Sequence, residues 1–325
     1  WKERMWMKMD KKRKMGYLLT ILGGTCWACS GACGQFLFEN RGLDANWVVT
    51  MRLLLAGLLL SAYSVGRWRS RAVDVFRSAK SIGALLVLGV LGLALCQYSY
   101  FRSIELSNAA TATTMQYTGL VLVMVWLVIS DKRMPRRNEL IAVACAVGGA
   151  FLLATHGDPS QLVLSSEALF WCLLGACAFA IYSVQPRGII SRFGTMPDTG
   201  FGMLIGGLVM CVIFKPWNLV GEWDIVTVLG MAFIVLFGTL CAFCCYLEGV
   251  RRIGAARGSI LAAVEPVVSA LLSVFWLGVP LGGMDFAGIA LIVAAMVLLA
   301  GDDKDKPDEQ SRETDEKIYV EAEKD

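Results

Sequence analysis

Ten long apolar stretches run through the sequence, and their length is the feature that most limits the possible folds. Each is 17 to 25 residues long and contains few charged side chains. An α-helix rises about 1.5 Å per residue, so about 20 apolar residues cross the roughly 30 Å of hydrocarbon in a bilayer. The sequence therefore predicts an all-α membrane protein with ten transmembrane helices, at approximately 16–38, 46–66, 82–101, 108–129, 139–155, 167–186, 198–214, 223–247, 254–278 and 284–300.

The composition favours lipid as the surrounding solvent. Of the 325 residues, 56% are hydrophobic and only 18% are charged. A soluble protein of this size would lack the polar surface needed to cover so many apolar residues.

The eleven cysteines all fall inside the apolar stretches, where we interpret them as small packing residues. A metal site built from Cys26 and Cys29, or from Cys241, Cys244 and Cys245, is the alternative interpretation. Such a site would lack a nearby histidine, since His156 is the only one in the chain. We expect neither a metal nor a cofactor.

Basic residues alternate between the two sides of the predicted bundle. With the N-terminus in the cytoplasm, 21 Lys and Arg residues fall in cytoplasmic segments, and only Arg41, Arg102 and Lys215 fall in outer loops. Short cytoplasmic segments of membrane proteins are enriched in Lys and Arg. This asymmetry predicts a multi-pass protein of the cell membrane with both termini cytoplasmic, and it favours ten helices, because removing one would scramble the alternation.

Similarity between the two halves of the chain indicates an internal repeat. Tyr100, Ile104 and the pair Ala109-Ala110 recur as Tyr246, Val250 and Ala255-Ala256, always at an offset of 146 residues. Because each half contains an odd number of helices, the second half enters the membrane from the opposite side, and the two repeats are inverted. Inverted repeats are frequent in transporters, where they underlie alternating access.

The repeat sets the predicted domain boundaries. Residues 16–156 form the first five-helix unit and residues 166–301 form the second, after a basic cytoplasmic N-terminus at 1–15. Residues 302–325 hold eleven acidic and five basic residues. An acidic tail that is poor in aromatic residues is typical of a disordered segment.

Several short motifs occur in order along both halves: Trp47 with Arg52-Leu53-Leu54-Leu55-Ala56-Gly57, the segment 100–110 and its copy at 246–256, Glu265-Pro266, Gly278 and Gly288. Together they resemble the EamA-type members of the drug/metabolite transporter superfamily over nearly the whole chain up to residue 300. The resemblance implies ten helices in two EamA repeats and transport of a small organic solute. Asp131-Lys132 and Gly278-Val279 stand where Gly-Glu is frequent in that family, and Gly119-Leu120 replaces Glu-Pro in the first half, so roles of those glutamates are not carried over.

Glu265 is the first candidate functional residue. If its helix starts near Gly254, the residue lies about 17 Å along the helix, close to the middle of the bilayer. A bare carboxylate at that depth costs at least a few kcal/mol, so the side chain should face the bundle interior. It is interpreted either as a proton- or cation-binding group beside the substrate path or as a hydrogen-bonded carboxyl that fixes helix packing. Pro266 removes a backbone hydrogen bond and predicts a kink or break at this point.

Other candidates are polar or aromatic residues within the predicted spans. Arg52 is interpreted either as an anchor for a substrate carboxylate or a buried acid, or as a side chain that extends outward to the interface. Trp27, Gln97, Gln116, Tyr117 and Tyr182 lie deeper, where they would line a central pocket touched by the first, third, fourth, sixth and ninth helices or would bond neighbouring helices. Tyr246 and Trp276 are nearer to helix ends, which is typical of interfacial aromatic belts.

These features favour a secondary active transporter of a small organic solute that works by alternating access, through proton coupling or exchange. The resemblance to the EamA-type family implies an amino acid, another metabolite or an organic cation as the substrate. The sequence has no Walker motif for a nucleotide-driven pump. A channel or non-transporting scaffold is the alternative. An intramembrane enzyme is less supported, because the chain has one histidine and no Gly-x-Ser-x-Gly. The expected partners are a small-molecule substrate and the lipid bilayer, not nucleic acid, and the chain would be a monomer or homodimer.

Overall fold

The computed structural model describes residues 2–68, 73–130, 132, 134–158, 163–184, 195–253, 258 and 261–302, and this part of the chain is helical without strands. The first half contains α1 (Lys2–Arg41), α2 (Ala45–Trp68), η1 (Asp74–Arg77), α4 (Ala79–Leu86), η2 (Val87–Ala94), α5 (Leu95–Leu106), α6 (Ala109–Gln116), α7 (Gly119–Ser130) and α8 (Arg137–Thr155). The second half contains α9 (Ser166–Val184), α11 (Thr195–Phe214), α12 (Ile225–Val235), η3 (Leu236–Cys241), α13 (Ala242–Ile253), α15 (Val264–Phe275) and α16 (Gly283–Asp302). The prediction of an all-α protein is therefore confirmed for the described residues.

Long apolar helices dominate the fold, as the apolar stretches predicted. Within the described residues, seven helices are long and apolar enough to cross a membrane, and Val264–Phe275 and Gly283–Leu299 are shorter apolar helices. Helix α1 differs most from its predicted range, because it begins at Lys2 and not near residue 16. Its extra turns are rich in Lys, Arg and Met, which are good helix formers, so the helix continues past the apolar stretch.

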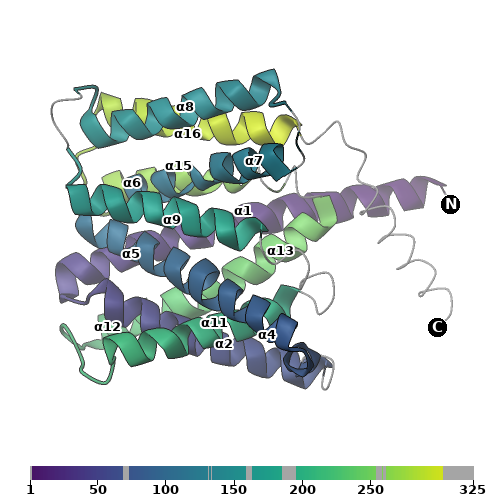
Figure 1. The fold of residues 1–325 in the computed structure, drawn as a ribbon, viewed down its shortest axis with the longest axis vertical. Coiled ribbons are helices and arrows are strands. Elements are labelled where there is room, and N and C mark those ends of the chain that lie inside the picture. Colours follow the sequence, from purple (N-terminus) through teal and green to yellow (C-terminus); the bar gives the residue numbers. More distant parts are fainter. Residues whose placement is uncertain are drawn as a thin grey trace.

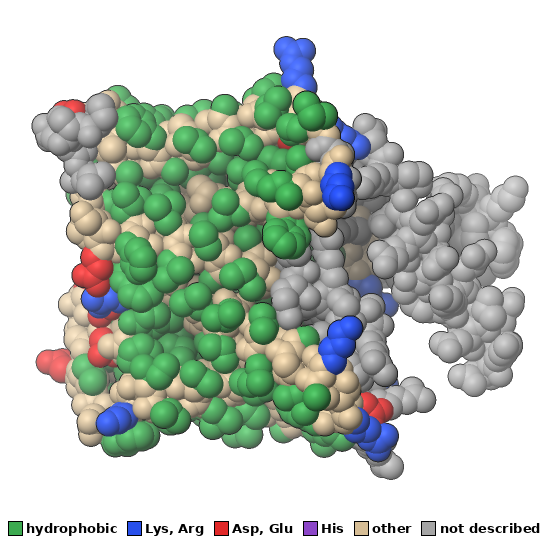
Figure 2. Space-filling view, in the orientation of Figure 1, with side chains coloured by type: hydrophobic (Ala, Val, Ile, Leu, Met, Phe, Trp, Pro, Cys, Tyr) green, Lys and Arg blue, Asp and Glu red, His purple; other side chains and the backbone are tan. Residues whose placement is uncertain are grey.

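The surface of the bundle has the polarity of a membrane protein. A broad hydrophobic band covers its middle, and charged side chains gather at the left and right edges of the view (Figure 2). Large apolar side chains such as Leu58, Trp126 and Val212 are exposed on helices from both halves. Such a continuous apolar surface is unfavourable in water and is suited to contact with lipid.

The helices run roughly parallel across the view, with α8 and α16 paired along one edge and α2 packed on α11 near the other (Figure 1). The start of α1 and the end of α16 lie on the same side of the bundle (Figure 1). Glycines allow the closest helix contacts: a Cβ on Gly57 would lie 2.7 Å from the Cα of Leu204, and one on Gly149 would lie 2.7 Å from the carbonyl oxygen of Gly288. Small residues at such contacts are typical of membrane helix packing.

Two helices contain π-helical segments, η2 between α4 and α5 and η3 between α12 and α13. The offset of 146 residues that relates the two halves places residues 236–241 of η3 on residues 90–95, which overlap η2. A π-helical segment interrupts the regular hydrogen-bond pattern and often occurs at functional sites. The two segments therefore direct attention to the interior of the bundle beside them.

Candidate functional site

Glu265 lies inside the bundle, where its side chain bonds a residue of the other half. It is 7% exposed, and its carboxylate oxygen Oε2 accepts a 2.5 Å hydrogen bond from the hydroxyl of Tyr117. Glu265 and Pro266 belong to the first turn of α15, which begins at Val264 after a turn at Ala263. In this first turn Pro266 needs no helical hydrogen-bond donor, so the break precedes the Glu-Pro pair.

Arg52 is also buried, at 2% exposure, so its side chain does not extend to the interface. Its Nε donates to Oγ1 of Thr239 at 2.7 Å, and its Nη2 donates to the carbonyl oxygen of Gly238 at 3.1 Å. The guanidinium also lies over the ring of Phe101, 4.9 Å from its centre. Arg52 therefore binds the π-helical segment η3 of the opposite half, where the altered hydrogen-bond pattern makes a backbone carbonyl available.

The charges of Arg52 and Glu265 lie on different helices and in different halves of the chain. Both side chains belong to the described residues, and no ion pair within 4.0 Å joins them. Nη1 of Arg52 is buried without a hydrogen-bond partner. The bundle thus holds an unpaired donor and a carboxylate of opposite charge, a combination that is unfavourable without further polar partners.

Aromatic side chains from both halves surround this region. Trp27 packs against Phe243 and Tyr246, with ring centres 5.1 and 5.0 Å apart. Phe179 lies between Tyr117 and Tyr182, with ring centres 6.1 and 6.0 Å away.

Gly24 sets the approach of α1 to this group, because a Cβ there would lie 2.8 Å from Val264 Cγ1 and 4.0 Å from Glu265 Cβ. Trp27, three residues further along α1, is on a neighbouring part of the same helix face. Trp27, Tyr117 and Glu265 therefore belong to one region of the bundle.

The two candidate glutamines have different surroundings. Gln116 donates from Nε2 to Sγ of Cys96 at 3.0 Å, which links α6 to α5. Gln97 is half-buried, and no hydrogen bond joins its side chain to another described residue. The structure therefore ties Gln116, but not Gln97, to a neighbouring helix.

Tyr246 is the clearest correction to the sequence interpretation. The sequence predicts a helix that ends at residue 247 and hence an interfacial position, but α13 continues to Ile253, and the half-buried Tyr246 packs on Trp27. Trp276 is half exposed at the end of α15, where it stacks on Phe36 at 5.8 Å.

A row of buried hydroxyl groups next to the carboxylate was not predicted. The hydroxyl of Tyr100 bonds Thr113 at 2.9 Å, and Thr113 bonds Ser269, one turn after Glu265, at 3.3 Å. The signal in the sequence is the presence of three threonines, at 111, 113 and 114, within an apolar helix. These contacts tie α5, α6 and α15 together around the carboxylate.

Cys241 and Cys245 lie close together, with their sulfur atoms 3.7 Å apart. Within the described residues, no group of three or more His, Cys, Asp or Glu side chains could hold a metal ion.

Comparison with known proteins relates nearly the whole chain to transporters. The EamA-like transporter family matches residues 14–155 and again residues 166–301. YicL, an uncharacterized inner membrane transporter of Salmonella typhimurium, is 32% identical over 91% of this chain and 98% of its own. RhtA of Escherichia coli, a threonine/homoserine exporter, is 28% identical over 86% of each chain.

A crystal structure 18% identical to this chain has the same fold, with a TM-score of 0.59 over 89% of this chain and 97% of that one. The family matches and the transporters related to the chain agree with the apolar helices of the fold. The chain therefore belongs to the EamA-like transporter family and is a multi-pass membrane transporter, not an enzyme.

Proposed function

We propose that the protein is a secondary active transporter that moves a small zwitterionic solute of the amino-acid class by alternating access, with proton coupling or exchange at Glu265. Two observations carry this proposal: the guanidinium of Arg52 is buried with no hydrogen-bond partner for its Nη1, and the carboxylate of Glu265 is buried without an ion pair to Arg52. An amino acid has a carboxylate and an ammonium group, which complement a guanidinium and a carboxylate respectively. The exporter activity named for RhtA supports the same substrate class.

The aromatic residues around the charges support recognition of an organic solute. Trp27, Tyr117 and Tyr182 offer apolar ring faces and polar edges, and an ammonium group is attracted to such ring faces. They would form the wall of a central substrate pocket together with Gln116. Gln97 belongs to the proposed wall on sequence grounds alone.

The proposed architecture has ten transmembrane helices in two inverted repeats, 16–156 and 166–301, with both termini in the cytoplasm. Two related π-helical segments, η2 and η3, support the repeat, and the shared side of the two described chain ends supports the common location of the termini. On this orientation the N-terminus 1–15 is cytoplasmic. The acidic tail is proposed to be disordered, and from residue 303 it lies outside the described residues. The assembly is proposed to be a monomer or a homodimer in the cell membrane.

Transport by purified protein in proteoliposomes tests the proposal. We expect saturable uptake and counterflow of labelled threonine or homoserine, with a rate that depends on pH. Glu265→Gln preserves side-chain size and a hydrogen-bond acceptor for Tyr117, but it cannot exchange a proton, so pH-dependent net transport should be lost while exchange persists. Glu222→Gln, in an exposed loop, is the control for loss of one carboxylate.

The outcomes separate the alternatives. Flux without saturation or counterflow would identify a channel, and no flux of any amino-acid-like solute would contradict the proposed substrate class. An unchanged rate and pH response in Glu265→Gln would remove this carboxylate from the mechanism.

A further inference from the structure

Among the described residues, three pairs of a basic with an acidic side chain join the first half of the chain to the second at the face proposed to be outside. Arg41 pairs with Asp224 at 3.3 Å, Arg102 with Glu167 at 2.8 Å, and His156 with Asp285 at 2.9 Å. Two repeats that move relative to each other must break such contacts when the outer face opens. The helices of the Arg102 pair, α5 and α9, continue inward to the candidate site.

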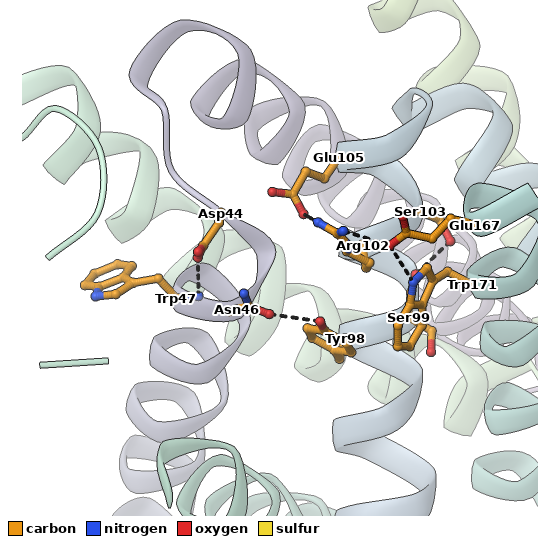
Figure 3. Close-up of polar contacts among 10 residues, drawn as sticks. All are labelled: Asp44, Asn46, Trp47, Tyr98, Ser99, Arg102, Ser103, Glu105, Glu167 and Trp171. Atoms are coloured by element: carbon orange, nitrogen blue, oxygen red, sulfur yellow. Dashed lines mark hydrogen bonds and ion pairs between the residues drawn. The ribbon is translucent and has the colours of Figure 1, made fainter. Parts of the chain in front are cut away.

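Arg102 is held by two carboxylates at once (Figure 3). Its Nη1 donates to Glu105 of the same helix at 2.7 Å, and its Nη2 donates to Glu167 of α9 at 2.8 Å. Trp171 donates from its indole Nε1 to the same oxygen of Glu167 at 3.4 Å. If Glu167 moves away, Arg102 keeps Glu105, so opening leaves no isolated guanidinium. Separation of α5 from α9 therefore leaves Arg102 with an ion-pair partner.

Below this contact the two helices are closely packed. Trp171 of α9 packs edge-on against Tyr98 of α5, with ring centres 5.1 Å apart, and Tyr98 donates to Oδ1 of Asn46 at 2.9 Å (Figure 3). Four residues further along α9, a Cβ on Gly175 would lie 3.3 Å from Cβ of Ser99, which neighbours Tyr98 on α5. The contact between α5 and α9 is thus closed from its charged outer end to Tyr98 and Gly175.

The inner ends of the same two helices carry residues of the candidate site. Cys96 of α5 accepts the hydrogen bond of Gln116, and Phe179 of α9 packs between Tyr117 and Tyr182. A route from the outer face to Glu265 along this interface must therefore pass the charged contact first.

We propose that Arg102 and Glu167 form the outer gate of the transport path, with Glu105 as the partner that retains Arg102 when the gate opens. This inference rests on the proposed function as a transporter. The gate is reversible because its charges are partly exposed: the side chains of Arg102, Glu105 and Glu167 are 27%, 19% and 54% accessible. Such pairs are weak and are screened by salt.

Cys172 provides a native reporter of the gate. It lies five residues after Glu167 on α9, about 7.5 Å deeper along the helix, and is 3% exposed. The thiol of Cys172 is therefore shielded from reagents in the outer solution while the gate is closed. The rate of its alkylation by a membrane-impermeant maleimide, measured by peptide mass spectrometry on the full chain in lipid nanodiscs, reports opening.

Glu167→Gln should raise this rate about two- to five-fold, the change expected for loss of one partly exposed ion pair. Glu105→Gln is the matched comparison: it removes a carboxylate from the same arginine, but the one that retains Arg102 in the open state, so the rate should stay at or fall below the wild-type rate. High salt should raise the wild-type rate towards that of Glu167→Gln and leave the variant almost unchanged.

Equal effects of Glu105→Gln and Glu167→Gln, or a wild-type rate that does not respond to salt, would overturn the gate. The salt measurement needs no variant, so a folding defect in Glu167→Gln does not decide the result. The labelling also needs no substrate. Gated labelling without any solute flux would refute the proposed function and leave the gate intact, whereas flux with labelling that is insensitive to Glu167 would refute the gate alone.

Discussion

Removal of the Arg52 side chain should destabilise the contact between α2 and the π-helical segment η3. The guanidinium makes two hydrogen bonds, to Thr239 and Gly238, and one contact with the ring of Phe101. Each charge-assisted hydrogen bond contributes about 1.5–3 kcal/mol, and a desolvated cation–π contact contributes about 2 kcal/mol. Burial of the charge opposes these terms by several kcal/mol.

The net change follows from what the substitution leaves behind. Arg52→Leu removes the charge together with its desolvation penalty, but the buried carbonyl of Gly238 loses its donor, and such a group costs about 1–3 kcal/mol. We therefore expect Arg52→Leu to lower the free energy of unfolding by about 1–3 kcal/mol. Arg52→Lys keeps the charge but lacks the forked donor geometry, so it should restore part of this stability.

Equilibrium unfolding in mixed detergent–SDS micelles measures these free energies. A double-mutant cycle of Arg52→Leu with Thr239→Val should give a coupling energy of at least about 0.5 kcal/mol, because the two side chains are in direct contact. Thr239→Ser keeps the hydroxyl and is the matched control. Strictly additive effects, or an Arg52→Leu protein as stable as the wild type, would refute a role of Arg52 in holding η3.

Two further predictions concern a glycine and a helix cap. Gly249→Ala should lower stability by about 1–3 kcal/mol, because its Cβ would lie 2.7 Å from the backbone nitrogen of Thr20, whereas Gly66→Ala, with no atom within 4 Å, should be neutral or stabilising in the same unfolding assay. Asp224 caps the N-terminal end of α12, and the hydrogen bond from the backbone N–H of Thr227 is the largest cause that lowers the pKa of its carboxyl. The ionised carboxylate therefore stabilises the fold at pH values above its ordinary pKa. This stabilisation is lost as the pH falls through the lowered pKa of the folded state. Thermal unfolding should thus show wild type more stable than Asp224→Asn at neutral pH, with the difference disappearing below about pH 4; a difference that persists in acid would contradict the assignment.

The sequence correctly indicated two buried charged residues, because exposing a charged side chain to lipid is energetically unfavourable. Glu265 and Arg52 are charged residues in apolar stretches, and both lie buried in the bundle. The sequence could not distinguish Tyr246, inside the bundle, from Trp276 at a helix end, because that distinction depends on where α13 stops and which face it turns to α1. Phe179 and Phe243 were missed for a related reason: an aromatic residue in a membrane helix is equally compatible with contact to lipid.

The sequence alone determined that the chain is helical and is embedded in lipid. The apolar length of each helix is a sum over its own residues, so it can be read without knowing which helices pack against it. It also indicated the repeat. Only the tertiary structure decided which polar groups meet. Tyr117 and Glu265 are 148 residues apart in the chain, and Arg52 and Thr239 are 187 residues apart. Such contacts depend on the rotation and depth of each helix, which are set by close packing between helix faces and not by the apolar length of either helix.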